Sequence, residues 1–364
     1  MRVVRIGWRH FRNLVAGGVE LDAGVNLIEG PNAQGKTNLL EAVAMLAWGR
    51  SPRTQHDAQI WTAGESGYRL DGEVERRSGS FRIAVEASAQ QRRRWLRGGV
   101  ARRAGVDPLG SLRAVLFWPD HLELVKGGPA VRRDFLDEDL GQSSPRYQSA
   151  VRRYDRILSS RNALLRGGEP SGALLDAWDA QLAEAGLAIR AARERMVAAI
   201  APLARESYAA MAGASPALEV RYVSGVPAQV SDAADFCAAL RERRAVDLAR
   251  GVTTLGPHRD DVALAIGTRD ARSAASQGEQ RTVALSLKWA AHRWLTEQDH
   301  GETPVLLLDD VLSELDEGRR RGLAQLIGKG QVLLTRVPNE ALPAGVPVGR
   351  RLRVEGGVVE VLAP

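Results

Sequence analysis

Residues 25–37 read Val25-Asn26-Leu27-Ile28-Glu29-Gly30-Pro31-Asn32-Ala33-Gln34-Gly35-Lys36-Thr37. The first five residues are typical of a buried strand, and the last eight match the pattern GxxxxGK[ST] at every fixed position. In this pattern a glycine-rich turn aims backbone N–H groups at phosphates, and the following helix adds its positive N-terminal end. The sequence therefore predicts a nucleoside triphosphate site, with Lys36 on the β- and γ-phosphates and Thr37 on Mg²⁺.

A second element is the apolar run Val305-Leu306-Leu307-Leu308, which is followed by two aspartates. Such a run indicates a strand that is buried on both faces, and ligands of parallel sheets gather at the carboxyl ends of the strands. Asp309 and Asp310 occupy that end. We expect Asp309 to hold Mg²⁺ through water and Asp310 to orient or deprotonate the attacking water.

A third element is Ser276-Gln277-Gly278-Glu279-Gln280, at the start of an amphipathic helix over residues 277–295. Ser276 and Glu279 have the spacing of a capping box, in which the serine accepts from the backbone and the glutamate reaches back. The small residues Ser276 and Gly278 also allow a phosphate to approach the helix N-terminus. The motif alone leaves open whether the cap is only structural or also meets a phosphate.

The composition is that of an ordinary globular protein, with 44% hydrophobic and 26% charged residues. A chain of 364 residues is longer than one hydrophobic core usually supports, so we expect two lobes. The sequence shows neither a signal-peptide core nor eighteen apolar residues in a row, and its single cysteine, Cys237, suits a reducing compartment. We therefore expect a cytoplasmic protein without a membrane span.

The formal net charge of +6 and the pI near 9.9 favour a polyanionic partner such as nucleic acid. Only four of the 50 basic residues are lysine, and a GC-rich genome also explains that arginine bias. Two clusters could contact a phosphate backbone. They are Arg92, Arg93, Arg94 and Arg97 beside Trp95, and Arg152, Arg153 and Arg156 in the helical part of the chain. For both clusters a solvated surface remains the alternative.

Strands and helices are expected in separate parts of the chain. Alternating patterns predict antiparallel strands over residues 68–74 and 81–86, and an apolar strand follows at 114–117. Residues 129–250 are mostly helical, and an a/d-like period over residues 175–196 predicts an antiparallel hairpin with the preceding helix. We expect Pro202 and Pro216 to interrupt any continuation, which excludes a long coiled coil.

The order of these motifs resembles the ABC-type ATPase head, and four stretches resemble the RecF family of bacterial recombination proteins. The stretches are Gly-Pro-Asn-Ala-Gln-Gly-Lys-Thr at 30–37, Leu-Glu-Leu-Val-Lys-Gly at 122–127 with Arg-Arg-Asp-Phe-Leu-Asp at 132–137, Thr-Leu-Gly-Pro-His-Arg-Asp-Asp at 254–261, and Ser-Gln-Gly-Glu-Gln-Arg at 276–281. The resemblance implies an α/β ABC-type head, built from a mixed sheet and an antiparallel β subdomain with an inserted helical lobe. Residues 1–120 and 251–364 would form the ATPase domain, and residues 121–250 the lobe.

The resemblance further implies a composite site in a symmetric dimer with two ATP molecules between the subunits. One subunit would contact the nucleotide through Gly30, Pro31, Asn32, Ala33, Gln34, Gly35, Lys36, Thr37 and Asn38. Its partner would supply the signature residues Ser276, Gln277, Gly278 and Glu279, with Asp316 in a loop that crosses the dimer axis. Asp310 stands where transporter heads usually carry glutamate, which implies slow hydrolysis, and Thr335 stands where they carry histidine.

The implied function is an ATP-dependent DNA-binding clamp of recombinational repair, DNA-damage (SOS) response and replication-fork maintenance. It would hold duplex DNA near single-strand junctions, help RecO and RecR to load RecA, and come apart on slow ATP hydrolysis. Two alternatives stay open, the energising subunit of a transporter and a small-molecule phosphotransferase. His258 could sense ATP or DNA, or could simply stabilise a turn.

Overall fold

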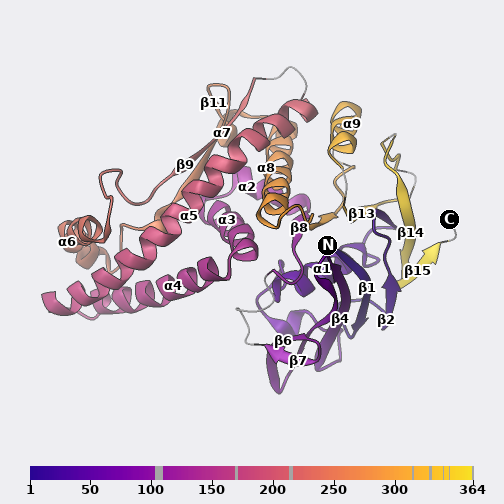
Figure 1. Cartoon of the computed structure of the whole chain (residues 1–364), viewed down its shortest axis with the longest axis horizontal. Coiled ribbons are helices and arrows are strands. Elements are labelled where there is room, and N and C mark those ends of the chain that lie inside the picture. Colours follow the sequence, from indigo (N-terminus) through magenta and orange to yellow (C-terminus); the bar gives the residue numbers. More distant parts are fainter. Residues whose placement is uncertain are drawn as a thin grey trace.

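The computed structural model describes the chain except for residues 103–109, 169–170, 213–215, 314, 328–329, 339, 344 and 363–364. Two large sheets lie on one side of the molecule and a helical lobe extends from them (Figure 1). The described helices are α1 (Lys36–Trp48), α2 (Glu123–Lys126), α3 (Pro129–Ser143), α4 (Pro145–Arg166), α5 (Gly172–Ala212), α6 (Ala233–Arg250), α7 (Ala271–Ala274), α8 (Gln277–Gln298) and α9 (Glu317–Leu326). The described strands are β1 (Arg2–Arg9), β2 (Gly17–Glu20), β3 (Val25–Glu29), β4 (Gly67–Arg76), β5 (Gly79–Ser88), β6 (Gln91–Arg97), β7 (Val100–Arg102), β8 (Ala114–Phe117), β9 (Leu218–Val223), β10 (Asp261–Ile266), β11 (Arg269–Asp270), β12 (Val305–Leu308), β13 (Val332–Arg336), β14 (Val348–Glu355) and β15 (Val358–Leu362).

The first sheet holds the phosphate-site strands and has the order β15-β14-β3-β13-β12-β8. All its neighbouring strands are parallel except the pair β14 and β15. Strand β13 lies between β3 and β12, so the carboxyl ends of these three strands share one edge of the sheet. This order brings Gly30, Asp309 and Thr335 to the same edge, which is where ligands of parallel sheets bind.

The second sheet is antiparallel, in the order β2-β1-β4-β5-β6-β7, and it confirms the strands expected over residues 68–74 and 81–86. Helix α1 is packed between the two sheets, and most of its side chains are buried. Successive side chains in the strands of the first sheet belong to two different hydrophobic cores. Leu307 and Leu333 belong to the core around α1, whereas Leu306 and Leu334 belong to the core around α5 and α8. Burial on both faces explains why β12 reads as a continuous apolar run.

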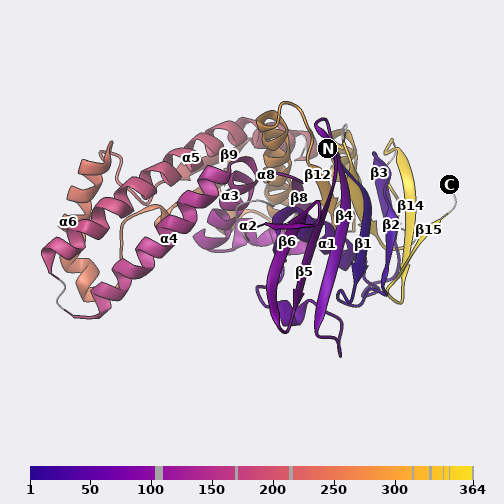
Figure 2. The ribbon, with the colours of Figure 1, turned by 60° about the horizontal axis from the view of Figure 1, so that its bottom comes forward.

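The helical lobe contains the expected hairpin, formed by α4 and α5 (Figure 2). The prediction that Pro202 interrupts this hairpin was wrong, because α5 has 41 residues and continues through Pro202 to Ala212. A proline inside a helix removes one backbone hydrogen bond. Beyond it, however, Tyr208 and Met211 are buried in the core that α5 shares with α8, so tertiary packing outweighs the local cost. At about 1.5 Å per residue the helix spans about 60 Å, and the described residues contain no longer helix.

Buried ion pairs hold the helical lobe together, and one of them joins it to the segment that follows it. Arg193 of α5 donates from Nη1 to Asp260 Oδ2 at 2.8 Å and from Nη2 to Asp137 Oδ2 at 2.9 Å. Arg161 of α4, which is fully buried, donates to Asp179 and Asp247 at 2.7 and 2.8 Å. Strand β9 lies before residue 250 and β10 after it, and the two strands pair in one sheet. The domain boundary at residue 250 therefore stays a prediction.

His258 lies inside this joint. Its Nδ1 is 2.7 Å from the Tyr154 hydroxyl, and its Nε2 is 2.9 Å from the carbonyl oxygen of Thr253. Burial lowers the pKa of His258 to about 4, so the ring is neutral near pH 7. Both ring nitrogens have partners in the folded chain, which favours the structural interpretation of His258 over a sensor of ATP or DNA.

Candidate nucleotide-binding site

The phosphate loop, residues 30–37, follows β3 directly, and a neighbouring strand restricts its first residue. A Cβ on Gly30 would lie 2.1 Å from the carbonyl oxygen of Val354 in β14, so only glycine fits beside that strand. Ala33 and Gly35 have positive φ angles of 63° and 118°, and Gly35 is followed directly by α1. Left-handed residues of this kind curl the backbone into a cradle whose N–H groups can bind an anion.

Lys36 spans the loop. Its Nζ donates to the carbonyl oxygens of Gly30 at 2.6 Å and Pro31 at 2.8 Å, and the residue is 8% exposed. Burial lowers the pKa of Lys36, and the nearby carboxylates of Asp309 and Asp310 oppose that shift. The ammonium group is therefore held at the mouth of the cradle, where a triphosphate would find a cationic partner.

Asp309 connects the loop with the neighbouring strands. Its Oδ2 accepts from the Thr37 hydroxyl at 2.8 Å and its Oδ1 from the Thr335 hydroxyl at 2.7 Å. Burial raises the pKa of Asp309, while these two hydrogen bonds act in the opposite direction. Two residues predicted to bind metal, Thr37 and Asp309, thus meet although 272 positions separate them in the sequence.

Asp310 has a conformation that fits a role in chemistry. It adopts a positive φ of 49°, and its backbone N–H donates to the Thr335 hydroxyl at 2.9 Å. Its buried Oδ1 has no hydrogen-bond partner within the described residues, and it borders a small pocket that Arg281 also lines. A buried carboxylate oxygen without a partner is costly, and a water molecule or a bound ligand would satisfy it. Thr335 touches both aspartates and so positions them.

The donor set fits a magnesium ion that is shared with a nucleotide. Within the described residues no three His, Cys, Asp or Glu side chains form a metal cluster. Mg²⁺ in nucleotide sites usually takes one or two protein oxygens and completes its shell with phosphates and water. Thr37 could supply such an oxygen directly, and Asp309 could hold the ion through water; both assignments stay predictions.

The signature turn, residues 276–279, forms the expected capping box. The Ser276 hydroxyl accepts from the Glu279 N–H at 3.3 Å, and Glu279 Oε2 accepts from the Ser276 N–H at 2.8 Å. The hydrogen bond from the Ser276 N–H, together with a hydrogen bond from Arg269, lowers the pKa of Glu279. Ser276 and Gln277 are exposed, and neither makes a described hydrogen bond to the phosphate loop of its own chain. The capping box is therefore present, and the exposed side of the turn is open to contact with another surface.

Several residues that support the phosphate loop belong to no recognisable motif in the sequence. Asn13 donates to the carbonyl oxygen of Ala33 at 3.3 Å and accepts from Asn38 at 2.7 Å. Gln34 Oε1 accepts from the N–H of Gly356 at 2.7 Å. The N-terminal segment and the β14–β15 turn therefore support the loop from both sides. Only the folded chain brings these segments together, so no local pattern could have identified them.

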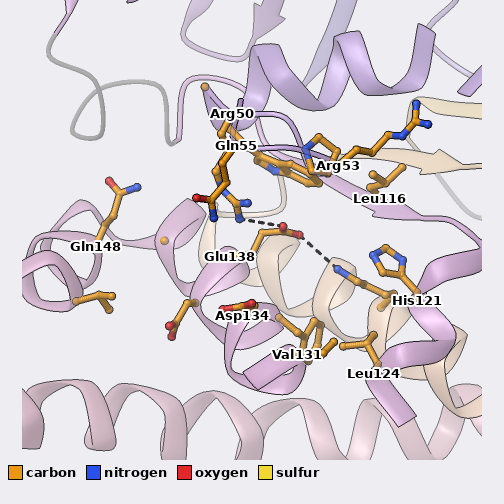
Figure 3. A pocket seen from close by; sticks show the side chains of 18 of the residues that line it. Arg50, Arg53, Gln55, Leu116, His121, Leu124, Val131, Asp134, Glu138 and Gln148 are labelled. Carbon is orange, nitrogen blue, oxygen red and sulfur yellow. Dashed lines mark hydrogen bonds and ion pairs between the residues drawn. The ribbon is translucent and has the colours of Figure 1, made fainter. Parts of the chain in front are cut away.

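A groove of about 1000 Å³ lies between the segment after α1 and the helices α3 and α4 (Figure 3). Glu138 stands in it and pairs with Arg50 at 3.3 Å and with Lys288 of α8 at 3.4 Å (Figure 3). None of the phosphate-loop residues or the Asp309 and Asp310 pair lines it. The groove separates the helical lobe from the α1 side of the molecule and is distinct from the nucleotide site.

The first predicted DNA cluster is largely neutralised inside the chain. Arg93 donates to Asp57 at 2.7 Å, Arg94 pairs with Glu86 at 2.5 Å, and the Arg97 guanidinium lies 4.1 Å from the centroid of the Phe81 ring. Arg92 is exposed. Three of these four side chains thus stabilise the antiparallel sheet, a role that the arginine run did not reveal.

The second predicted cluster lies on α4. Arg153 pairs with Glu184 at 2.9 Å, whereas Arg156 is exposed and donates only to the carbonyl oxygen of Arg152 at 3.3 Å in the described chain. Burial and the nearby Arg156 lower the pKa of Arg152. Among the described residues neither Arg152 nor Arg156 has an acidic partner, unlike Arg93 and Arg94, so they are more available to an external anion.

Known proteins are similar in sequence to this chain over nearly its whole length. The DNA replication and repair protein RecF of Acidothermus cellulolyticus is 41% identical over 374 residues, which cover 99% of this chain and 100% of that protein. The chain belongs to the RecF family. RecF of Streptomyces avermitilis is 38% identical over 383 residues, with 99% and 100% coverage. A family model described as an AAA domain matches residues 4–127.

Solved structures give the same result. RecF with ATP, described as a recombination mediator protein in the RecFOR pathway, superposes with a TM-score of 0.90 at 30% identity, over 99% of this chain and 97% of that one. An Smc head bound to the C-terminal winged-helix domain of ScpA matches at a TM-score of 0.56 and 16% identity, which supports the shared ABC-type fold alone. The transporter alternative gains no support from these RecF-family relatives. No helix in the described part of the chain has the length and apolar composition to cross a bilayer.

Proposed function

We propose that this RecF-family chain is an ATPase of recombinational DNA repair and replication-fork maintenance that dimerises around two ATP molecules. One contrast carries the proposal. Lys36, Thr37 and Asp309 form one half-site, in which Thr37 donates to Asp309, Lys36 donates to the loop carbonyls, and all but the half-buried Thr37 are buried. The signature turn, by contrast, presents Ser276 to solvent and has no described bond to that half-site. The exposed turn of one subunit would then complete the buried half-site of the other.

The side chains have distinct tasks in this proposal. Lys36 would leave the carbonyl oxygens of Gly30 and Pro31 and bind the β- and γ-phosphates. Thr37 and Asp309 would direct their oxygens to Mg²⁺, which neutralises phosphate charge when it is bound. Asp310 would orient the attacking water, and its short side chain supports slow hydrolysis that ends the dimer.

The closed dimer would hold duplex DNA near single-strand junctions in the cytoplasm and, with RecO and RecR, help to load RecA. The names of the solved relatives, which place RecF in the RecFOR pathway, support these partners. Arg152 and Arg156 are two predicted DNA contacts that lie close together on α4 and have no described acidic partner. We place the DNA surface on the α4 side for that reason.

Sedimentation velocity with and without Mg-ATP tests the dimer. The wild-type chain should sediment as a monomer without nucleotide and as a dimer with it. Asp310→Asn should hydrolyse ATP at least ~10-fold more slowly and remain dimeric, because the water-orienting carboxylate is lost while the binding residues stay. A chain that stays monomeric at saturating Mg-ATP, in both forms, would contradict the proposal.

Salt dependence tests the DNA contacts. If about five phosphates are contacted, the log–log slope of affinity against salt should be roughly −4 to −5. Exchanging Arg152 and Arg156 for glutamine should reduce the slope by about 2, whereas exchanging the paired Arg93 and Arg94 should change it less. A slope near zero would remove the backbone-binding proposal.

A further inference from the structure

Arg319 lies directly against the signature turn. Its Nη1 is 3.2 Å from the position that a Cβ on Gly278 would occupy. The residue belongs to α9, which packs against α5. Asp316 holds it from the other side, accepting from the Arg319 backbone N–H at 2.9 Å and from its Nη1 at 2.5 Å. One guanidinium thus joins the signature turn to the loop that the family resemblance places at the dimer axis.

The surroundings leave this guanidinium able to bind a further anion. Asp316 is its one described acidic partner, and the Asp316 side chain is 58% exposed. Glu279 of the same turn is already engaged by the Ser276 N–H and by Arg269 at 2.9 Å. The buried Nε of Arg319 has no partner within the described residues, and a guanidinium carries five N–H donors in all.

We propose that Arg319 contacts the terminal phosphate of the nucleotide bound to the other subunit. The inference rests on the proposed dimer and adds to it a residue that acts in trans. A phosphate that approaches the N–H groups at the start of α8 arrives beside the guanidinium, because both lie at Gly278. Arginine binds phosphate oxygens through two parallel hydrogen bonds. Asp316 holds the side chain in place until the phosphate replaces it.

Three mixtures of variant chains test this role through ATP turnover. In the reference, a small amount of wild-type chain is mixed with a tenfold excess of Lys36→Ala chain, so each mixed dimer has one working phosphate loop. In the second, Arg319→Ala chain replaces the wild type. In the third, the excess chain carries both Lys36→Ala and Arg319→Ala. Action in trans predicts that the second mixture equals the reference and that the third falls at least ~10-fold.

The reverse pattern would mean that Arg319 acts on its own subunit's nucleotide, and three equal rates would mean that it does not contact the phosphate. Either result overturns the inference and leaves the dimer intact. A wild-type chain that stays monomeric at saturating Mg-ATP would overturn the dimer itself, and the inference with it. The matched control replaces Arg321, an exposed arginine of the same helix, with alanine. When the excess chain of the third mixture carries Lys36→Ala and Arg321→Ala, ATP turnover should equal that of the reference.

Discussion

The phosphate loop and the signature turn, which we propose as the two halves of one nucleotide site, differ in burial and in bonding within the chain. Around the loop, Lys36 and Asp309 are buried, the half-buried Thr37 donates to Asp309, and Lys36 donates to two loop carbonyls. Around the turn, Ser276 and Asp316 are exposed and bonded only within their own helix ends. The first region is organised by folding, so substitutions there should affect the isolated chain. The second should matter mainly when two chains meet.

The largest effect is expected for Lys36→Ala. It removes the ammonium group that two loop carbonyls hold in place, and charged hydrogen bonds contribute about 1.5–3 kcal/mol each. ATP affinity, measured by calorimetry on the monomer, should fall by at least ~100-fold. Lys126→Ala, on α2 outside the site, should bind ATP normally. Equal affinities of the two variants would show that the loop does not bind the phosphates.

Gly30→Ala should come next. The added methyl group would lie 2.1 Å from the Val354 carbonyl oxygen, so β14 must shift, and overpacking of this kind costs about 1–3 kcal/mol. We expect a lower free energy of unfolding in urea together with weaker ATP binding. Gly128→Ala is the control, since nothing lies within 4 Å of its added Cβ and its φ is −75°. Unchanged stability of Gly30→Ala would mean that the cradle is looser than described.

Thr335→Val should have an intermediate effect. It keeps the shape but removes the hydroxyl that donates to Asp309 and accepts from the Asp310 N–H. Leaving such buried groups unpaired costs about 1–3 kcal/mol. Unfolding experiments should show this loss, and ATP hydrolysis should slow by about tenfold. Thr335→Ser retains the hydroxyl and should restore both properties; if it does not, the hydroxyl is not what matters.

Sequence patterns predicted this buried half-site well and its surroundings poorly. The loop and Asp309 were predictable because each ends a buried strand in a short local pattern that the chemistry of phosphate binding requires. The contacts of Asn13 and Arg319 depend on which distant segments pack together, and no local pattern encodes that. The prediction for Pro202 was wrong for the same reason, because packing of α5 on α8 outweighs a local helix-breaking preference. Similarly, Arg93 and Arg94 turned out to be bonded within the chain.

The smallest effect in the isolated chain is expected for Glu279→Ala. Loss of the capping box should cost about 0.5–1 kcal/mol, and Glu297→Ala, exposed near the other end of α8, should cost less. Because the pKa of Glu279 is lowered in the folded chain, its contribution is present above about the ordinary value of 4.5 and is lost as the pH falls through the folded value. Urea titrations at pH 7 and pH 4 should show the two variants converging at the lower pH.

The most direct test of the account asks whether the signature turn of one chain touches the nucleotide of the other. A chain carrying both Lys36→Ala and Ser276→Cys, in a Cys237→Ser background, cannot bind ATP itself but presents a thiol at the turn. It is mixed with Cys237→Ser chain and an ATP analogue that bears a thiol-reactive group on the γ-phosphate. The account predicts that the thiol at position 276 is labelled only when the nucleotide-binding chain is present. Labelling that does not depend on the second chain, or no labelling of a dimer that has formed, would contradict it.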